Sequence, residues 1–205
     1  MVDTGASSSR LPLMPRPPRA RAPLLEAALR LFVERGIDGT GIRDLAKAAG
    51  CSEAAIYRHW ASKEALVKAL YQEHLAEVCR LLDAAVIASD DLETQVRAAT
   101  AALYTLFDDH PLVFRFVLLA KQDLKVAHDL ATRSPLDLVQ AMAERAVTEG
   151  RTNADPGLLA AALTGTFLET AVFVLYGRLP GPLTRHADDV AGIALHLLSC
   201  KVESP

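Results

Sequence analysis

Side chains that can donate hydrogen bonds to nucleic acid gather in the stretch from Ser52 to Lys63. Hydroxyl, imidazole, guanidinium and ammonium groups surround one apolar residue there, Ile56. Such groups can reach phosphate oxygens and the edges of bases. Small residues at the beginning of the stretch, Ala54 and Ala55, would let a helix backbone enter a DNA major groove, which is about 12 Å wide. The residue types therefore indicate a DNA contact, with an ordinary amphipathic helix pair bearing a solvated polar face as the alternative.

A second group, Asp108-Asp109-His110, could in principle be catalytic or bind a metal. Adjacent helical residues point about 100° apart, so three in a row do not converge on one ion. Pro111 follows and indicates a helix end, so we interpret the group as helix capping. The chain lacks nucleotide-binding glycine loops and the HExxH and GxSxG motifs, so we expect no enzyme, no catalytic residue, no metal ligand and no cofactor. Four other histidines stand alone and are expected to be solvated or hydrogen-bonded: His74, His128, His186 and His196.

Two short helices are expected to position the polar stretch. Apolar residues at helical spacing predict the first helix, namely Ile42, Leu45, Ala46 and Ala49. Gly50 follows where a helix end needs a left-handed residue, and with Ala46 it is expected to let the two helices approach closely. Ser52 is the expected N-cap of the second helix, and Glu53 suits its first turn. Helix, glycine-containing turn and helix form a helix-turn-helix.

Residues 36–66 read GIDGTGIRDLAKAAGCSEAAIYRHWASKEAL. This stretch resembles the amino-terminal domain of the TetR family of transcriptional repressors, and the similarity covers roughly residues 21–70. Gly41 departs from the family, where a β-branched residue is common, and Trp60 replaces the usual Phe. The resemblance rests on an opening threonine, an apolar and small-residue core, an aromatic run and a small-residue-Lys-Glu box: Thr40, Leu45, Ala46, Ala49, Gly50, Ser52, Tyr57, His59, Trp60, Ser62, Lys63 and Glu64.

The resemblance and the residue types together predict the DNA contacts. Lys63 stands near a helix start, where its charge is unfavourable unless an anion such as a DNA phosphate offsets it. Beyond about residue 70 the family shares architecture rather than sequence, so the resemblance identifies no ligand. The expected DNA-binding residues are Thr40, Arg43, Ser52, Glu53, Ala54, Ala55, Tyr57, Arg58, His59 and Lys63.

The fold class predicted for the chain is all-α. Ala and Leu dominate, and β-branched runs bounded by turn signals are scarce. A helix over residues 21–35, with an apolar stripe at Leu25, Ala28, Leu29 and Phe32, should complete a three-helix domain, and Thr40 should cap the next helix. About nine helices are expected, the later ones over residues 62–88, 92–109, 111–120, 123–131, 135–149, 156–176 and 186–199.

We expect three segments in the chain. Residues 1–20 are rich in Ser, Pro and Arg and are predicted to be disordered. Their arginines, with Arg21, form either a basic arm that touches a neighbouring DNA groove or an idle tail. Residues 21–66 form the helix-turn-helix domain, and residues 67–205 form a ligand-binding and dimerisation domain. The helix over residues 62–88 is expected to be the only mechanical connection between these two domains.

For the larger domain, the resemblance implies a mostly apolar cavity that takes a small apolar or amphipathic effector. The expected lining residues are Cys79, Tyr104, Phe107, Phe114, Leu118, Met142 and Phe167. The last two long helices are too apolar for lone surface helices, so we expect them to pair with their symmetry mates in a homodimer. The expected interface residues are Gly165, Phe173, Ile193 and Leu197.

Charge and cysteine content fit an intracellular DNA-binding protein. Residues 1–63 hold ten Lys and Arg against six Asp and Glu, whereas residues 64–205 hold twelve against nineteen. Three cysteines without metal-binding spacing argue against a disulfide framework, and residues 1–20 lack a signal-peptide core. The apolar stretch 158–176 contains Glu169 and has no basic flank, so we expect a buried helix rather than a membrane span. The expected location is the cytoplasm.

These observations predict a ligand-responsive repressor that binds a pseudo-palindromic operator in double-stranded DNA. Two alternatives remain at this point. One is a DNA-organising protein of the same fold without an inducer. The other is a small-molecule-binding or enzymatic α-helical bundle in which the helix-turn-helix pattern is incidental.

Overall fold

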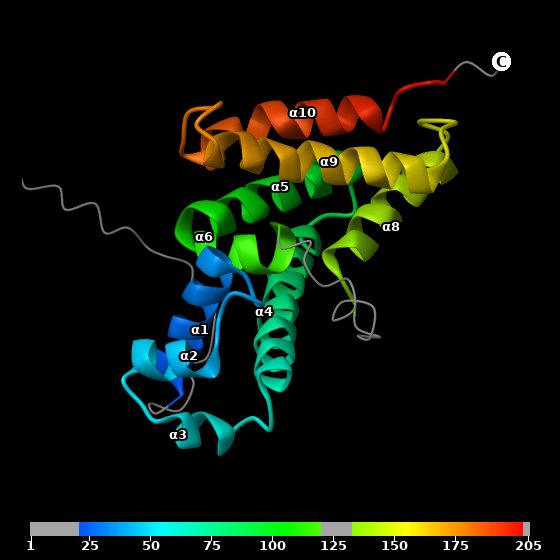
Figure 1. The fold of residues 1–205 in the computed structure, drawn as a ribbon. Helices are drawn as coiled ribbons and strands as arrows, with labels where there is room; N and C mark the ends of the chain where they lie inside the picture. Colours follow the sequence, from blue (N-terminus) through cyan, green and yellow to red (C-terminus); the bar gives the residue numbers. More distant parts are fainter. Residues whose placement is uncertain (1–20, 120–132, 203–205) are drawn as a thin grey trace, which may run out of the picture.

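The computed structural model describes residues 21–119 and 133–202, and these residues form helices joined by loops, without a β-strand (Figure 1). The predicted disordered tail and the predicted helix over 123–131, with His128, lie outside the described residues. The all-α prediction is confirmed. The helices are α1 (Ala22–Arg35), α2 (Ile42–Ala49), α3 (Glu53–Tyr57), α4 (Lys63–Val86), α5 (Leu92–Asp109), α6 (Pro111–Phe114), α8 (Pro135–Thr148), α9 (Pro156–Leu175) and α10 (Ala187–Leu197), with a π-helical segment η1 (Arg115–Leu119) and a 3₁₀ segment η3 (Leu183–His186).

The first three helices form the lower left part of the molecule in Figure 1. α1 buries the predicted stripe, in which Ala28 is fully buried, and it ends at Gly36 with φ 77°. Gly39 lies in the turn that follows. A Cβ atom at Gly39 would stand 2.4 Å from the carbonyl oxygen of Arg35, so the chain can pass this point only with glycine. This close passage sets the direction in which α2 leaves α1.

The remaining helices form the larger part of the molecule, above and to the right in Figure 1. α9 and α10 lie side by side along its outer edge, and α10 packs on α5 while α9 packs on α8. Asp108 at the end of α5 fixes η3, because its carboxylate accepts hydrogen bonds from the backbone N–H groups of Leu183 (2.8 Å) and Thr184 (2.9 Å). The capping interpretation of Asp108 therefore holds, although the capped helix is η3 rather than a neighbour in sequence.

α4 is a 24-residue helix that runs from the helix-turn-helix into the larger part. Its predicted apolar positions are buried, among them Leu66, Leu70 and Val78. It is not the only connection, however. Phe32 of α1 stacks on Phe116 of η1 with ring centroids 6.3 Å apart, so a second set of contacts joins the two parts. The expectation of a single mechanical connection is wrong because the sequence does not reveal that α1 meets η1.

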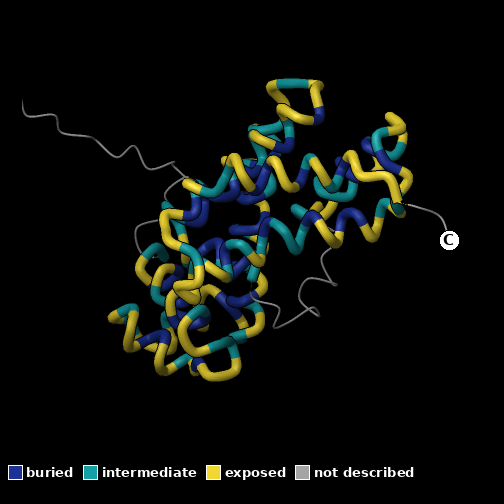
Figure 2. Tube along the Cα trace, turned by 90° about the horizontal axis from the view of Figure 1, so that it is seen from above, coloured by how far each residue is buried: buried dark blue, intermediate teal, exposed yellow. Residues whose placement is uncertain are grey.

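Two predicted helices differ from the structure in their internal form. The helix that starts at Pro111 becomes π-helical at Arg115, and the last helix is preceded by the 3₁₀ turn of η3. α9 is long and apolar enough, by length and composition, to cross a membrane. Its buried positions lie on one face, and Glu169 and Phe173 are exposed on it. Figure 2 shows the same division along the chain, with buried residues in the interior and exposed ones on the outer faces of the helices.

Candidate DNA-binding surface and ligand cavity

The polar stretch identified in the sequence lies on α3 and the turn after it. Ser52 caps α3 as predicted, since its hydroxyl accepts a hydrogen bond from the backbone N–H of Ala55 at 3.2 Å. Ile56 is fully buried, whereas Tyr57 is 52% exposed and Arg58 and His59 are exposed. One apolar residue therefore holds α3 against the core while the polar side chains stay free for a partner.

Trp60 supports the far end of α3. Its ring is buried and meets the ring of His59 edge-on, with centroids 5.5 Å apart. The guanidinium carbon of Arg21 lies 4.8 Å from the centre of the indole ring, within cation–π distance. Arg21 is thus held on the domain. The prediction that Arg21 belongs to a basic arm is therefore wrong.

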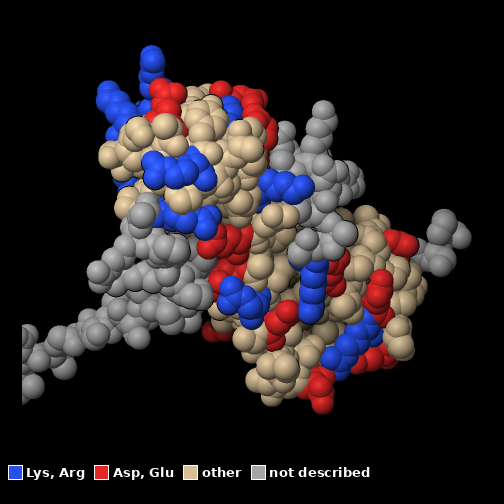
Figure 3. Space-filling view, turned by 90° about the horizontal axis from the view of Figure 1, so that it is seen from below, with Lys and Arg blue, Asp and Glu red and all other residues tan. Residues whose placement is uncertain are grey.

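Arg43 and Glu53 were both expected to contact DNA, and the structure pairs them with each other. The Nε atom of Arg43 lies 3.4 Å from a carboxylate oxygen of Glu53, and the Arg43 side chain is 90% exposed. Exposed ion pairs of this kind contribute at most about 1 kcal/mol. A DNA phosphate can therefore displace Glu53 at little cost. Figure 3 shows several Lys and Arg side chains on the face seen from below, which is the end of the molecule where α3 lies in Figure 1.

Thr40 has neither of the roles predicted for it, which were DNA contact and capping of the next helix. It is fully buried, so it presents no surface to DNA. Its hydroxyl donates to the carbonyl oxygen of Gly36 at 2.8 Å, with that of Leu31 at 3.3 Å, and thus fixes the end of α1. The N-cap of α2 is Gly41, whose backbone N–H donates to Asp44 at 3.1 Å. Burial of the threonine hydroxyl against α1 outweighs its local capping tendency.

Lys63 also has a partner inside the protein. Its ammonium donates to the carbonyl oxygen of Ile37 at 3.0 Å and so ties the start of α4 to the loop between α1 and α2. Ser62 caps α4 as predicted. The inference that only an external anion could offset the lysine charge is therefore wrong, because a backbone carbonyl already does so. Two further N–H donors of the ammonium remain for a phosphate.

The turn between α2 and α3 depends on Gly50 through its backbone conformation. Gly50 has φ 65° and ψ 32°, the left-handed region that was predicted for it. A Cβ atom placed there would meet nothing within 4 Å, so close helix approach is not the reason for this glycine. Ala46, the other small residue of the expected pair, is buried on the inner face of α2.

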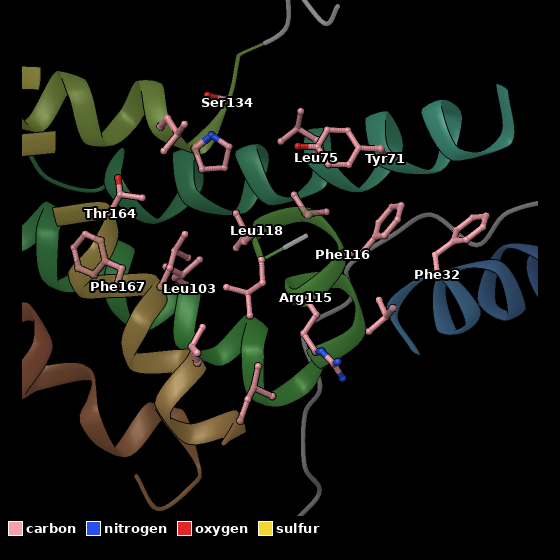
Figure 4. Close-up of a pocket in the computed structure, with 18 of the residues that line it drawn as sticks. Phe32, Tyr71, Leu75, Leu103, Arg115, Phe116, Leu118, Ser134, Thr164 and Phe167 are labelled. Carbon is pink, nitrogen blue, oxygen red and sulfur yellow. The ribbon is translucent and has the colours of Figure 1, made fainter. Parts of the chain in front are cut away.

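A cavity of about 1440 Å³ lies between the two parts of the molecule (Figure 4). It is bordered by α1 and the loop after it, and by α4, α5, η1, α8 and α9. The volume exceeds the about 300–1,000 Å³ of many small-molecule sites. Most of the side chains shown in Figure 4 are apolar, with Thr164, Ser134 and Arg115 among the few polar ones.

The structure brings three of the seven predicted ligand-contacting residues to the cavity wall: Leu118, Met142 and Phe167. The predictions for the other four are wrong because their side chains fill the interior or are paired elsewhere. Phe107 and Phe114 meet edge to face, 5.1 Å apart. Tyr104 donates its hydroxyl to the carbonyl oxygen of Phe167 at 3.2 Å, and burial raises its pKa to about 12. Cys79 donates to the carbonyl oxygen of Arg133 at 3.3 Å, and burial raises the pKa of its thiol.

Several wall residues were missed in the sequence. Tyr71 and Phe116 meet edge to face at 6.0 Å, with Phe32 stacked on the other side of Phe116. Burial, with a further contribution from the charge of Cys79, raises the pKa of the Tyr71 phenol. One signal was present in the sequence: Phe114 and Phe116 are two positions apart, so on a helix they point to different sides and meet different neighbours.

The arrangement matches a known family. The family model described as "bacterial regulatory proteins, tetR family" matches residues 24–70, which cover α1 to the first part of α4. The activator FasR of Mycolicibacterium smegmatis is 30% identical over 135 residues, which are 62% of this chain and 61% of FasR. The repressor KstR2 of Mycobacterium tuberculosis H37Rv is 44% identical over 55 residues, 27% of this chain and 28% of KstR2.

Residues 24–70 of this chain are thus a TetR-family DNA-binding domain by sequence. Solved structures show that the family fold extends beyond the amino-terminal helices. A tetR-family regulatory protein from Rhodococcus RHA1 superposes with a TM-score of 0.72 at 22% identity, over 89% of this chain and 98% of that one. FadR of Bacillus subtilis, solved in complex with stearoyl-CoA, has a TM-score of 0.71 at 16% identity, over 86% and 97% of the two chains. At these identities the likeness concerns the fold alone.

The outer face of α9 and α10 carries exposed apolar side chains. Phe173 is 51% exposed and Ile193 is 54% exposed, while Leu197 is partly buried. Gly165 and Gly192 have no atom within 4 Å of a Cβ position, so both leave open space at the helix surface. The four residues predicted for a dimer interface thus lie on the two outermost helices, as Figure 1 shows for the helices.

Proposed function

We propose that this protein is a ligand-responsive transcriptional regulator that binds double-stranded DNA through α3. The observation that supports this proposal is that Tyr57, Arg58 and His59 are exposed, next to the buried Ile56 that anchors α3. These residues belong to the domain that matches the TetR-family model. The protein acts by binding rather than by catalysis, in the cytoplasm. Because the chain spans 61% of FasR and 28% of KstR2, the function of those relatives is extended to it only as part of this proposal.

The proposed DNA contacts divide into two kinds. Arg58 and Tyr57 reach phosphates, Ser52 and His59 reach phosphates or base edges, and the small residues at the start of α3 allow it into the major groove. Arg43 joins them after exchanging Glu53 for a phosphate. Lys63 contributes its remaining N–H donors while its bond to Ile37 holds α4 in place. Thr40 supports the domain from within.

The proposed active form is a homodimer that joins through α9 and α10 and binds a pseudo-palindromic operator. Two recognition helices enter successive major grooves when they are about 34–36 Å apart. A ligand binds in the domain formed by residues 67–205, where that domain borders residues 21–66. It favours a conformation in which the two recognition helices have a different spacing. Operator affinity then falls by the difference in ligand affinity between the two conformations. The protein is a repressor in this mechanism.

Salt-dependent DNA binding tests the proposal. Arg58→Ala should weaken binding to operator DNA and flatten the slope of log K against log salt by about 0.9, because one phosphate contact is lost. Fluorescence anisotropy with a labelled duplex measures both quantities. Arg97→Ala is the matched control, since Arg97 is an exposed arginine on α5 that pairs with Glu93. Equal affinity and slope for Arg58→Ala and wild type would contradict the assignment of α3 as the DNA-reading helix.

A further inference from the structure

Arg115 occupies an unusual position in the cavity wall. It is the first residue of the π-helical segment η1 and is partly buried. In Figure 4 it is drawn near the centre of the view, between Phe167 and Thr164 on the left and Phe116 and Phe32 on the right. The cavity therefore has a cationic group within a wall that is mostly apolar.

The side chain of Arg115 has no hydrogen bond or ion pair with any residue that the structure describes. A guanidinium carries five N–H donors and stays charged at every accessible pH. Partial burial of such a group without a counter-ion is unfavourable, and an anion with two oxygens would satisfy it in bidentate geometry. The site is complete only when an anion is present.

Other charged residues border the same cavity, but none of them serves as a counter-ion for Arg115. Glu34, Arg35 and Asp38 come from the end of α1 and the loop after it, and all three are exposed. Neither carboxylate forms an ion pair with Arg115. Exposed charges are screened by water and salt, whereas the partly buried guanidinium is screened less.

Resting on the proposed function, we propose that Arg115 binds the anionic head group of the effector, and that the effector is a linear amphipath with a carboxylate or phosphate head. The rest of the wall suits an alkyl chain, since Leu103, Leu118 and Phe167 are among the apolar side chains on it. Each buried methylene of such a chain strengthens binding, because it removes apolar surface from water.

The position of Arg115 also connects head-group binding to the DNA-binding domain. The next residue, Phe116, touches Phe32 of α1 and Tyr71 of α4. A head group that draws Arg115 inward therefore acts on the segment that contacts both α1 and α4. π-Helical turns within helices occur frequently at functional sites, which fits a segment that can change its hydrogen bonding.

The test uses laurate, dodecyl phosphate and 1-dodecanol with the full-length protein, each below its aggregation concentration. Isothermal titration calorimetry should show that the wild type binds at least one of the two anions roughly 10- to 100-fold more tightly than the alcohol. Arg115→Met should remove this preference and leave alcohol binding unchanged, and Arg115→Lys should keep part of it. Arg178→Met, a change at an exposed arginine outside the cavity wall, should behave as the wild type. The two anions distinguish a carboxylate from a phosphate head.

Three outcomes would overturn the inference. Equal affinity of the wild type for anions and alcohol is one, and loss of the anion preference in Arg35→Met but not in Arg115→Met is another. The third is a protein that binds none of the three compounds. Unchanged alcohol binding in Arg115→Met shows that the variant is folded. If laurate binds through Arg115 and DNA affinity stays the same, the proposed function fails while the head-group site stands.

Discussion

His74 is a buried imidazole on α4 whose Nδ1 has no hydrogen-bond partner in the described part of the chain. Burial, with a smaller contribution from the charge of His110, lowers its pKa to about 4. The imidazole of the unfolded chain has a pKa of about 6.5. As pH falls below about 6.5, the unfolded chain therefore gains a proton that the folded protein binds only near pH 4.

This difference predicts a loss of stability in mild acid. The free energy of unfolding should decrease by up to about 3 kcal/mol between pH 6.5 and pH 4 on account of His74 alone. His74→Leu, which is similar in volume and neutral at all pH values, should remove that part of the decrease. Urea unfolding at several pH values measures the effect, with His196→Gln on the exposed side of α10 as the control. A His74→Leu variant with the same pH dependence as the wild type would show that the imidazole is not the cause.

At the scale of the helices, the boundaries that the sequence predicts best are those set by local chemistry. Pro111, Pro135 and Pro156 each begin a helix, and α5 spans the predicted residues 92–109. Capping serines and a left-handed glycine act within a few residues of the helix end, so sequence alone reveals them. These signals, with the apolar spacing on α1 and α2, made the fold class and the helix-turn-helix predictable.

The cavity wall was less predictable because it depends on how helices face one another. Phe114 and Phe116 belong to the same short stretch, yet the first packs on Phe107 in the interior and the second meets α1. Thr40 likewise has the residue type and position of a helix cap, but it is buried against α1. The π-helical form of η1 has no signature in the sequence that separates it from an ordinary helix. Aromatic content indicated that a lining exists without indicating which rings form it.

The contact between η1 and α1 leads to a prediction about coupling. Phe116→Leu removes ring contacts with Phe32 and Tyr71 while keeping an apolar side chain. Ligand binding should persist, but saturating ligand should weaken operator binding by a smaller factor than the roughly 5- to 150-fold typical of allosteric coupling. Anisotropy titrations with and without laurate measure this factor.

The control for this coupling is Phe107→Leu, which removes a ring pair between α5 and α6 and leaves Phe32, Tyr71 and Phe116 unchanged. It should leave the coupling factor unchanged even if it lowers stability. If both variants kept the wild-type factor, the ligand would act through α4 alone, and the aromatic contact between η1 and α1 would be structural only. Reciprocity gives a second check, since operator DNA must weaken ligand binding by the same factor.

At the scale of the whole molecule, α9 and α10 carry several large apolar side chains that are exposed in the single chain. Leu158, Phe173 and Ile193 are exposed there, at 71%, 51% and 54%. Soluble monomers rarely leave such side chains together on one face. Gly192 on α10 leaves space for another helix to approach, whereas Gly165 on α9 lines a small pocket with Leu118 and Leu119 of η1. A second copy of the chain, related by a two-fold axis, would bury these residues on both partners at once.

Ile193→Asp tests this assembly. Because Ile193 is exposed in the single chain, aspartate there should barely change the stability of a protomer, whereas in a dimer it would be a buried charge without a partner and cost several kcal/mol. Sedimentation analysis at micromolar concentration should therefore show a dimer for the wild type and a monomer for Ile193→Asp. Operator affinity should fall with the loss of the dimer, because a monomer places one recognition helix instead of two. Ile87→Asp, at an exposed isoleucine just after α4, should leave the dimer intact. A wild-type monomer, or an Ile193→Asp variant that stays dimeric, would show that α9 and α10 serve another purpose.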